Sequence, residues 1–318
     1  MSRVPEFIWI KDDRLLPKEL LGAVVAVGNF DGVHAGHLAV LNTALAEAEK
    51  RCVPAITLTF EPHPRSFFKP GEPVFRLTPP AEKARLINGL GFSAMVQKRF
   101  DTAFARMAAA DFVEQMLAGE LQTCHVIAGH DFHFGKQRAG TPQFLQEHCA
   151  ELNIGVTLVE PVRNSAGHTI SSTRIRQALS EGKIEIANYL LGRRWRVTGK
   201  VVRGKQLGRT LGFPTANLQL ARETTLAHGI YAVRVIRADA TWHDGVASFG
   251  RRPTFDNGEA LLESFLFDFS GSLYGEQIGV EFHCYLRGEE KFESAEALVL
   301  QMRRDEATAR QRLAGIAR

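Results

Sequence analysis

The stretch from Val24 to His37, VVAVGNFDGVHAGH, places the strongest constraint on how this chain can fold. An apolar run ends at Gly28, and a turn with further glycines then presents His34 and His37. Apolar residues recur at helical spacing after His37, so the pattern predicts a strand, a turn and a helix. Backbone N–H groups and the helix dipole both attract negative charge at such a turn, which favours a phosphate site.

A plain strand-to-helix turn with incidental histidines is the simplest alternative. However, four polar side chains, Asn29, Asp31, His34 and His37, stand where a plain turn needs one or two. We therefore favour the phosphate site.

Length and composition indicate an ordinary globular protein. The 318 residues suit two domains, each with its own core. The net charge of +4 is small and its basic residues are spread out, so nucleic acid is not required. No apolar run is long enough to span a bilayer, and the N-terminus lacks the apolar segment of a signal peptide. The four cysteines lack CxxC spacing, which is typical of reduced thiols in the cytoplasm.

Strand-like and helix-like segments alternate as far as about Leu191, which predicts a doubly wound α/β domain. A strand over residues 55–60 leads into EPHPRSFF, where two prolines should force an extended loop. Ligands bind at this edge of an open parallel sheet, so His63 could contact one, although a rigid surface turn is an equal alternative. Further on, Thr78 is the expected N-cap of a helix, and Asp111 with Glu114 fits a capping box.

Two later segments carry candidate ligand contacts. In GHDFHFGKQRAG, Asp131, Phe132 and Phe134 stand on a glycine frame that suits a planar heterocycle with a phosphate, or simply a mobile loop. In ISSTRIR, three hydroxyls and two arginines exceed what helix capping needs and imply an oxyanion partner.

The pattern changes near Gly192–Trp195, where short strands with frequent glycines begin. We expect a six-stranded β-barrel followed by a C-terminal helix that Ser294 caps. The predicted domains are therefore residues 1–192 and 193–318.

The segment GKVVRGK, from Gly199, matches a P-loop only superficially, because Gln206 follows in place of a magnesium-binding hydroxyl. We read VVRGKQLGRTLGFPTANL instead as a loop whose glycines let the backbone approach phosphates, with a plain glycine-rich hairpin as the alternative. Thr215 and Asn217 then offer neutral oxygens suited to Mg²⁺. Glu263 is an acid among apolar residues and could simply face solvent.

Several of these motifs, GNFDGVHAGH, TFEPHP, GHDFHFG, ISSTRIR and PTAN, together resemble the bacterial bifunctional riboflavin kinase/FAD synthetase family. The resemblance runs from about Leu21 to Arg310. It implies that the C-terminal domain phosphorylates riboflavin to FMN with ATP. The N-terminal domain would then adenylylate FMN with ATP, giving FAD and pyrophosphate.

The resemblance also implies residue roles. Glu263, His34, His37 and Arg174 would be catalytic, and Thr215 and Asn217 would bind Mg²⁺. Flavin contacts would come from His63, Asp131, Phe132, Phe134 and Arg252. ATP contacts would come from Gly28, Asn29, Phe30, Asp31, Gly36, Ser171, Ser172, Thr173, Arg176, Gly204, Gly208 and Arg209.

Three residues depart from the family's pattern. Ser248 stands where many members have Asn, Phe265 where many have His, and His133 where Arg is usual. These differences bear on flavin affinity and orientation more than on the type of reaction.

Two other functions remain alternatives. One is a cytidylyl- or pantetheine-phosphate-type transferase whose barrel binds a regulator, and the other is an RNA-binding protein that uses a basic barrel. The expected partners are riboflavin, FMN and ATP, without nucleic acid or membrane. FMN and FAD would be substrates or products, and a monomer is expected although the sequence does not fix the oligomeric state.

Overall fold

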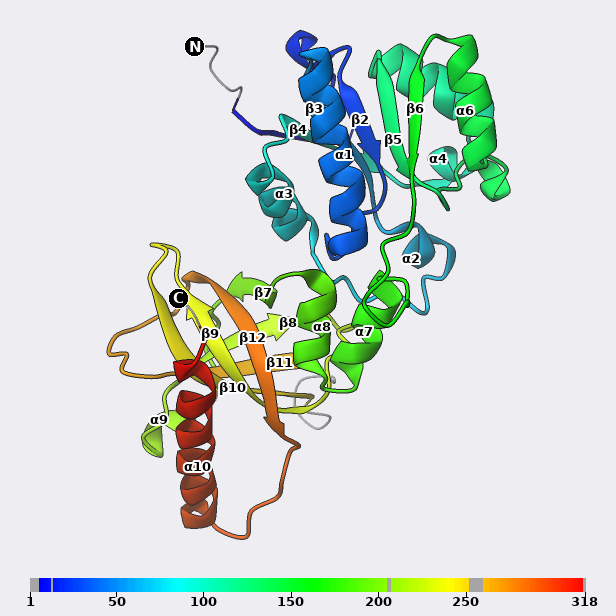
Figure 1. The fold of residues 1–318 in the computed structure, drawn as a ribbon. Helices are drawn as coiled ribbons and strands as arrows, with labels where there is room; N and C mark the ends of the chain where they lie inside the picture. Colours follow the sequence, from blue (N-terminus) through cyan, green and yellow to red (C-terminus); the bar gives the residue numbers. More distant parts are fainter. Residues whose placement is uncertain (1–5, 13, 205–206, 252–259, 317–318) are drawn as a thin grey trace. The chain divides into compact units, whose positions relative to one another are not determined.

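The computed structural model describes residues 6–12, 14–204, 207–251 and 260–316. Its chain divides into two compact units, drawn in Figure 1. The first unit comprises Met1–Val74 and Thr78–Ser171, and the second comprises Phe75–Leu77 and Ser172–Arg318. A three-residue segment of the N-terminal half therefore packs with the C-terminal half.

The first unit is built on a six-stranded parallel sheet with the strand order β1-β4-β3-β2-β5-β6. All four residues of its central strand β2 are buried. Continuous apolar runs of this kind are expected when helices cover both faces of a parallel sheet. The strands are β1 (Ile8–Lys11), β2 (Val24–Val27), β3 (Ala55–Glu61), β4 (Ala94–Arg99), β5 (His125–Gly129) and β6 (Gly155–Val159).

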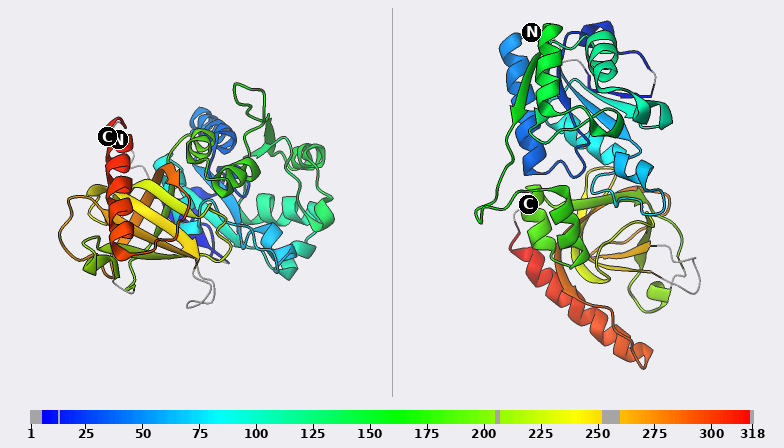
Figure 2. Two further views of the ribbon diagram at one scale, coloured as in Figure 1. Left: turned by 90° about the horizontal axis from the view of Figure 1, so that it is seen from below. Right: turned by 90° about the vertical axis from the view of Figure 1, so that its right-hand side faces the viewer.

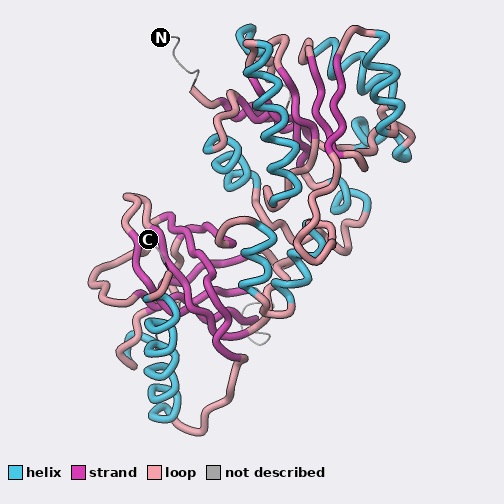
Figure 3. The backbone as a smooth tube through the Cα atoms, in the orientation of Figure 1, coloured by secondary structure: helices cyan, strands magenta, loops and turns pink. Residues whose placement is uncertain are grey.

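Helices cover both faces of this sheet, as the cyan and magenta segments of Figure 3 show. Val24 and Ala26 pack with α1 (Ala35–Arg51) and α3 (Pro80–Gly89) on one face. Val25 and Val27 pack on the other with η2 (Phe112–Glu120) and α6 (Pro142–Glu151). The predicted doubly wound domain is confirmed. The shorter helices are η1 (Lys18–Leu20), α2 (Pro64–Phe68), α4 (Thr102–Arg106), α5 (Ala109–Asp111) and η3 (Lys136–Arg138).

The extended loop expected for EPHPRSFF is wrong. Pro64 is the first residue of the short helix α2, and His63 caps it by accepting a hydrogen bond from the Arg65 N–H at its Nδ1 atom (3.1 Å). Proline restricts the residue before it, but its own fixed φ suits the first turn of a helix.

Two predicted helix caps are also wrong. The N-cap of α3 is Pro79, and the Thr78 hydroxyl accepts a hydrogen bond from the Gly32 N–H instead. Asp111 is the last residue of α5 and continues with a helical backbone into the π-helix η2, and its side chain accepts a hydrogen bond from the Gln115 side chain. A cap needs a non-helical backbone, which these local patterns do not guarantee.

The second unit contains a six-stranded antiparallel sheet with the order β7-β12-β9-β10-β11-β8. An isolated bridge between Val202 and Asn217 brings the two ends of the sheet together, so the predicted barrel is confirmed as nearly closed. Leu218, Phe249 and Leu262 lie side by side on three strands and are fully buried inside it. The strands are β7 (Trp195–Lys200), β8 (Thr215–Leu220), β9 (Gly229–Ile236), β10 (Trp242–Arg251), β11 (Ala260–Leu266) and β12 (Gln277–Arg287).

The C-terminal helix α10 (Ala295–Ala314) covers part of the barrel, and Ser294 caps it as predicted. Ala309 and Leu313 in its second half pack against the strands, while its first half extends past them (Figure 2). The other helices of this unit are α7 (Ser172–Ser180), α8 (Ile184–Leu191) and α9 (Leu207–Thr210). Within the described ranges, no helix is both long and apolar enough to cross a membrane.

Trp195, at the start of β7, ties several segments of the second unit together and is 1% exposed. Its backbone N–H donates to Asn188 of α8 at 2.7 Å, and its indole N–H donates to the Leu77 carbonyl at 3.1 Å. The Phe75 ring lies edge-on to the indole, and Arg176 of α7 donates to the Phe75 carbonyl at 2.7 Å. These contacts hold Phe75–Leu77 within the second unit.

Buried His283 on β12 should make the stability of the barrel depend on pH. Burial, and then the positive charges of Arg194 and Arg234, lower its pKa to about 4, against an opposing effect of Asp244. The unfolded chain therefore binds a proton more readily between pH 6.5 and 4, and the free energy of unfolding should fall as the pH falls through this window. Between pH 7 and 5 we expect a loss of about 1–2 kcal/mol from this residue.

Urea unfolding of the second unit at pH 7 and pH 5 measures this effect. His283→Gln should reduce the loss of stability between the two values, whereas His228→Gln, at an exposed position of the same unit, should not. An unchanged pH dependence in His283→Gln would show that other groups cause it.

Candidate active sites

The turn after β2 has a strained backbone. Phe30, Gly32 and Val33 all have positive φ angles, of 47°, 97° and 40°. Such an angle is a genuine outlier for a β-branched residue like Val33. Strained positions persist only where the surrounding structure fixes them, and they cluster at ligand sites.

The structure brings together the two histidines predicted to be catalytic. His34 is the N-cap of α1, and its Nδ1 atom accepts a hydrogen bond from the His37 N–H at 3.3 Å. The two rings stack with centroids 3.7 Å apart and planes 18° apart, and the Phe30 ring meets His37 edge-on. These contacts fix the orientation of both imidazoles at the helix N-terminus, where the dipole favours anions.

Two glycines of the turn have little room for a side chain. A Cβ atom on Gly36 would lie 3.1 Å from the His34 ring and 3.3 Å from the Ile170 carbonyl oxygen. A Cβ atom on Gly28 would lie 3.0 Å from the Phe30 ring, which is buried in the core. Ile170 directly precedes Ser171, so the start of ISSTRIR lies beside the turn within the first unit.

The Asp31 side chain and the backbone of the turn are held by residues outside it. The Asp31 carboxylate is buried and accepts from the N–H (3.0 Å) and the hydroxyl (3.3 Å) of Thr78. The Asn29 carbonyl accepts from the Thr59 hydroxyl at 3.3 Å. The backbone of this segment is thus fixed by side chains from outside it.

The motif ISSTRIR runs across the division between the units. Ser171 is the last residue of the first unit, and α7 begins the second unit at Ser172, so Thr173, Arg174 and Arg176 lie on α7. Arg174 is half-buried, and the Nε atom of Arg176 already donates to the Phe75 carbonyl.

The predicted flavin contacts of the first unit have different surroundings. Asp131 is exposed, while Phe132 is half-buried and stacks on Phe134 with centroids 5.4 Å apart. Phe134 itself is buried in the core against Phe112. His63 is buried, with its Nδ1 atom engaged in capping α2.

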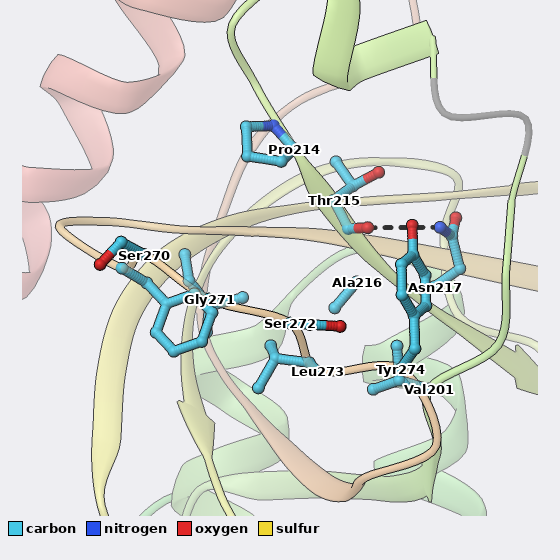
Figure 4. A pocket seen from close by; sticks show the side chains of 12 residues that line it. Val201, Pro214, Thr215, Ala216, Asn217, Ser270, Gly271, Ser272, Leu273 and Tyr274 are labelled. Atoms are coloured by element: carbon cyan, nitrogen blue, oxygen red, sulfur yellow. Dashed lines mark hydrogen bonds between the residues drawn. The ribbon is translucent and has the colours of Figure 1, made fainter.

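In the second unit, a cavity of about 510 Å³ lies between the start of β8 and the loop of residues 269–274 (Figure 4). Thr215, Asn217, Ser272 and Tyr274 are among its lining residues. The Asn217 amide nitrogen donates to the Thr215 carbonyl at 3.4 Å. Its oxygen is buried and has no hydrogen-bond partner in the part of the chain that the structure describes. A buried polar atom of this kind requires an explanation, such as a ligand or an ion.

Glu263 lies beside Asn217, one of the residues that line this cavity. The strand register sets it opposite Asn217 of β8 and opposite Ser248 of β10, so the three side chains share the outer face of the barrel. Directly opposed side chains in a sheet are close neighbours. The structure therefore brings the predicted base beside the predicted magnesium ligand, and Glu263 is half-buried there.

The glycine-rich loop supports this surface. A Cβ atom on Gly204 would lie 2.7 Å from the Asn217 amide nitrogen, and one on Gly208 would collide with the Phe213 carbonyl. Arg209 lies on α9, and its side chain is not described. Arg252, the predicted flavin contact of the barrel, lies outside the described residues.

The sequence prediction missed Ser272 and Tyr274 of the cavity, and it gave Thr78 the wrong contact. The run SGSLYG carries only a turn signal, because its residues meet Thr215 and Asn217 only once the barrel closes. Thr78 stands before two prolines, which is a capping signal, while its partner Asp31 is far away in the sequence.

Comparisons with known proteins agree with the two sets of motifs. The FAD synthetase family profile matches residues 16–174, and the riboflavin kinase profile matches residues 191–313. The bifunctional riboflavin kinase/FMN adenylyltransferase of Escherichia coli K12 is 38% identical over 290 residues, which are 91% of this chain and 92% of that protein. The chain belongs to this bifunctional family. Its Pseudomonas fluorescens member is 41% identical over 296 residues, covering 93% of this chain and 94% of that protein.

Family membership confirms the predicted riboflavin kinase and FMN adenylyltransferase activities and the order of the two domains. The two alternative functions, a transferase with a regulatory barrel and an RNA-binding protein, are therefore rejected. A crystal structure titled as a macrolide-efflux protein from Streptococcus pneumoniae is also similar, with 33% identity and a TM-score of 0.84. The match covers 96% of this chain and 99% of that one, so the likeness extends over both units.

We predict that Gly36→Ala impairs the adenylyl transfer. The added methyl group must displace the His34 ring or the Ile170 carbonyl by a few tenths of an ångström. Small misplacements of catalytic groups are costly, so FAD formation from FMN should fall roughly tenfold. Riboflavin phosphorylation by the same protein should not change. Gly89→Ala is the matched control, because a Cβ atom there meets nothing within 4 Å; equal rates in both variants would contradict the prediction.

We also predict that Gly204→Ala impairs riboflavin phosphorylation. Its methyl group would push the Asn217 amide out of position, since the two would lie only 2.7 Å apart. FMN formation should fall roughly tenfold, with FAD formation from supplied FMN unchanged. Gly288→Ala, whose Cβ atom meets only an ordinary contact at 3.6 Å, should behave like the parent. Full kinase activity in Gly204→Ala would show that the Asn217 position is not critical.

Proposed function

We propose that the family's two reactions are divided between the two halves of the chain. Residues 1–192 would adenylylate FMN, and residues 193–318 would phosphorylate riboflavin. The observation that carries this proposal is the strand register that sets Glu263 beside Asn217, which lines a cavity. The stacked histidine pair at the start of α1 supports the other half of it.

The boundary that we propose at residue 192 separates the two activities, whereas the two compact units divide at Ser171–Ser172. The two family profiles leave residues 175–190 between them, and α7 and α8 belong to the second unit by their packing. We therefore assign ISSTRIR to adenylyl transfer by its motif, although most of it lies on α7.

In the kinase reaction, the riboflavin 5′-hydroxyl oxygen attacks the γ-phosphorus of ATP. A hydroxyl is a poor nucleophile, so a carboxylate that accepts its proton lowers the barrier. Glu263 would be this base. The bond to the β–γ bridging oxygen breaks, and ADP leaves.

The oxygens at the cavity fit a magnesium ion. Thr215 and Asn217 offer neutral oxygens, and the Asn217 side-chain oxygen lacks another partner among the described residues. Hard oxygen ligands of this kind suit Mg²⁺, which would offset the charge of the phosphates there. Gly204, Gly208 and Arg209 would contact the nucleotide from the adjoining loop.

In the adenylyl transfer, a phosphate oxygen of FMN attacks the α-phosphorus of ATP, and pyrophosphate leaves. The phosphate is already ionised, so no strong base is needed. His34, His37 and the first backbone N–H groups of α1 would hold ATP and stabilise the charge that develops at the α-phosphate. By their motif, Arg174 is assigned to catalysis of this reaction, and Ser171, Ser172, Thr173 and Arg176 are assigned to binding its ATP.

The flavin side of that reaction would be formed by Asp131, Phe132 and His63. The Phe134 ring is buried, so it would act by supporting Phe132. The enzyme would work in the cytoplasm as a monomer on riboflavin, FMN and ATP, without nucleic acid or membrane.

A pair of substitutions should separate the two activities. Glu263→Gln keeps the shape but cannot accept a proton, so FMN formation should fall by about 10²–10⁴-fold. His37→Ala removes a donor to the transition state, so FAD formation from FMN should fall by about 10²–10³-fold. Each variant should retain the other activity, as measured by separating flavins after incubation with ATP and Mg²⁺.

The two variants serve as controls for each other. Loss of both activities in a folded His37→Ala protein would refute the division between the halves. Kinase activity within a few-fold of the parent in Glu263→Gln would show that this carboxylate is structural.

A further inference from the structure

Thr78 makes an unusual set of contacts for a residue at the start of a helix. It is 1% exposed and leaves the capping of α3 to Pro79. Its hydroxyl accepts from the Gly32 N–H at 2.8 Å and donates to the Asp31 carboxylate at 3.3 Å. Its backbone N–H donates to the same carboxylate oxygen at 3.0 Å. One side chain thus binds two consecutive residues of the histidine-bearing turn.

These two residues lie where the turn is most strained. Asp31 and Gly32 stand between Phe30 and Val33, whose φ angles of 47° and 40° are unfavourable for residues with side chains. The surroundings must hold such a backbone in place. Without the Thr78 hydroxyl, the buried N–H of Gly32 would lose this acceptor.

A second contact from α3 reaches the other end of the same turn. The Lys83 ammonium group, 1% exposed, donates to the Thr59 hydroxyl at 2.9 Å. That hydroxyl donates in turn to the Asn29 carbonyl at 3.3 Å. Thr78 therefore holds the turn at Asp31–Gly32, and Lys83 holds it at Asn29 through Thr59, shortly before His34.

We propose that Thr78 is a positioning residue for the adenylyl transfer. Its role would be to fix the strained turn, so that His34 and His37 keep their stacked geometry while ATP reacts. This inference rests on the function proposed above for the first unit. A misplacement of about 1 Å can cost 10²-fold in rate, so the effect should appear in kcat.

The test compares Thr78→Ser with Thr78→Ala in the full chain. Both variants lose the methyl group, and they differ only in the hydroxyl. FAD formation from FMN and ATP should have a kcat roughly 10- to 100-fold lower in the alanine variant than in the serine variant. The serine variant should remain within a few-fold of the parent, and KM for FMN should change much less than kcat.

Two controls distinguish positioning from loss of fold. Riboflavin phosphorylation by the same molecules should be equal in parent, Ser and Ala variants. Thr123→Ala removes another buried threonine hydroxyl of the first unit, one that has no hydrogen-bond partner among the described residues. It should leave kcat for FAD formation unchanged.

The outcomes are distinct. Equal kcat values for the Ser and Ala variants would overturn the inference, and so would a loss in Thr78→Ala that Thr123→Ala reproduces. The inference would also be overturned if a smaller fraction of folded protein explained the whole loss of rate in Thr78→Ala. Active-site titration and thermal unfolding measure that fraction. If the parent protein itself makes no FAD, the proposed function of the first unit fails. If the parent makes FAD and the Ser and Ala variants have equal kcat values, only the role of Thr78 fails.

Discussion

The first unit depends on a backbone conformation that a β-branched residue resists. Val33 has a φ of 40°, and it is held there because Phe30 is buried in the core beneath Gly28 and Thr78 binds Asp31 and Gly32. This path brings the chain from the end of β2 into α1 with His34 as its cap. The strand, the turn and the helices around them therefore act together to hold two imidazoles at a helix N-terminus.

In the barrel, the strand register positions the site residues, as the strained turn does in the first unit. Leu218, Phe249 and Leu262 face inward in one row, and the neighbouring row, Asn217, Ser248 and Glu263, faces outward. A slip of one residue would bury the polar row and expose the apolar one, so the hydrophobic core fixes the position of the carboxylate. Ser248 and Phe265, which depart from the family's pattern, lie on this same outward face, next to Glu263 and opposite Thr215.

The sequence predicted what periodicity and local motifs encode. The buried run of β2, the barrel strands and the Ser294 cap follow from patterns that span a few residues. It failed where a distant partner decides the outcome. Thr78 carries a capping signal but binds Asp31, and the Phe134 ring, placed among charged residues in the sequence, is buried against Phe112. Tyr274 joins Thr215 at a cavity only after the barrel closes.

The packing of Phe75–Leu77 with the second unit means that the chain passes between the two units three times. Phe75 and Leu77 are almost fully buried, and their contacts come from Arg176 and Trp195. During synthesis from the N-terminus, these apolar side chains leave the ribosome long before their partners exist. The first unit can therefore complete its sheet early, yet it carries an uncovered apolar segment until β7 has been made.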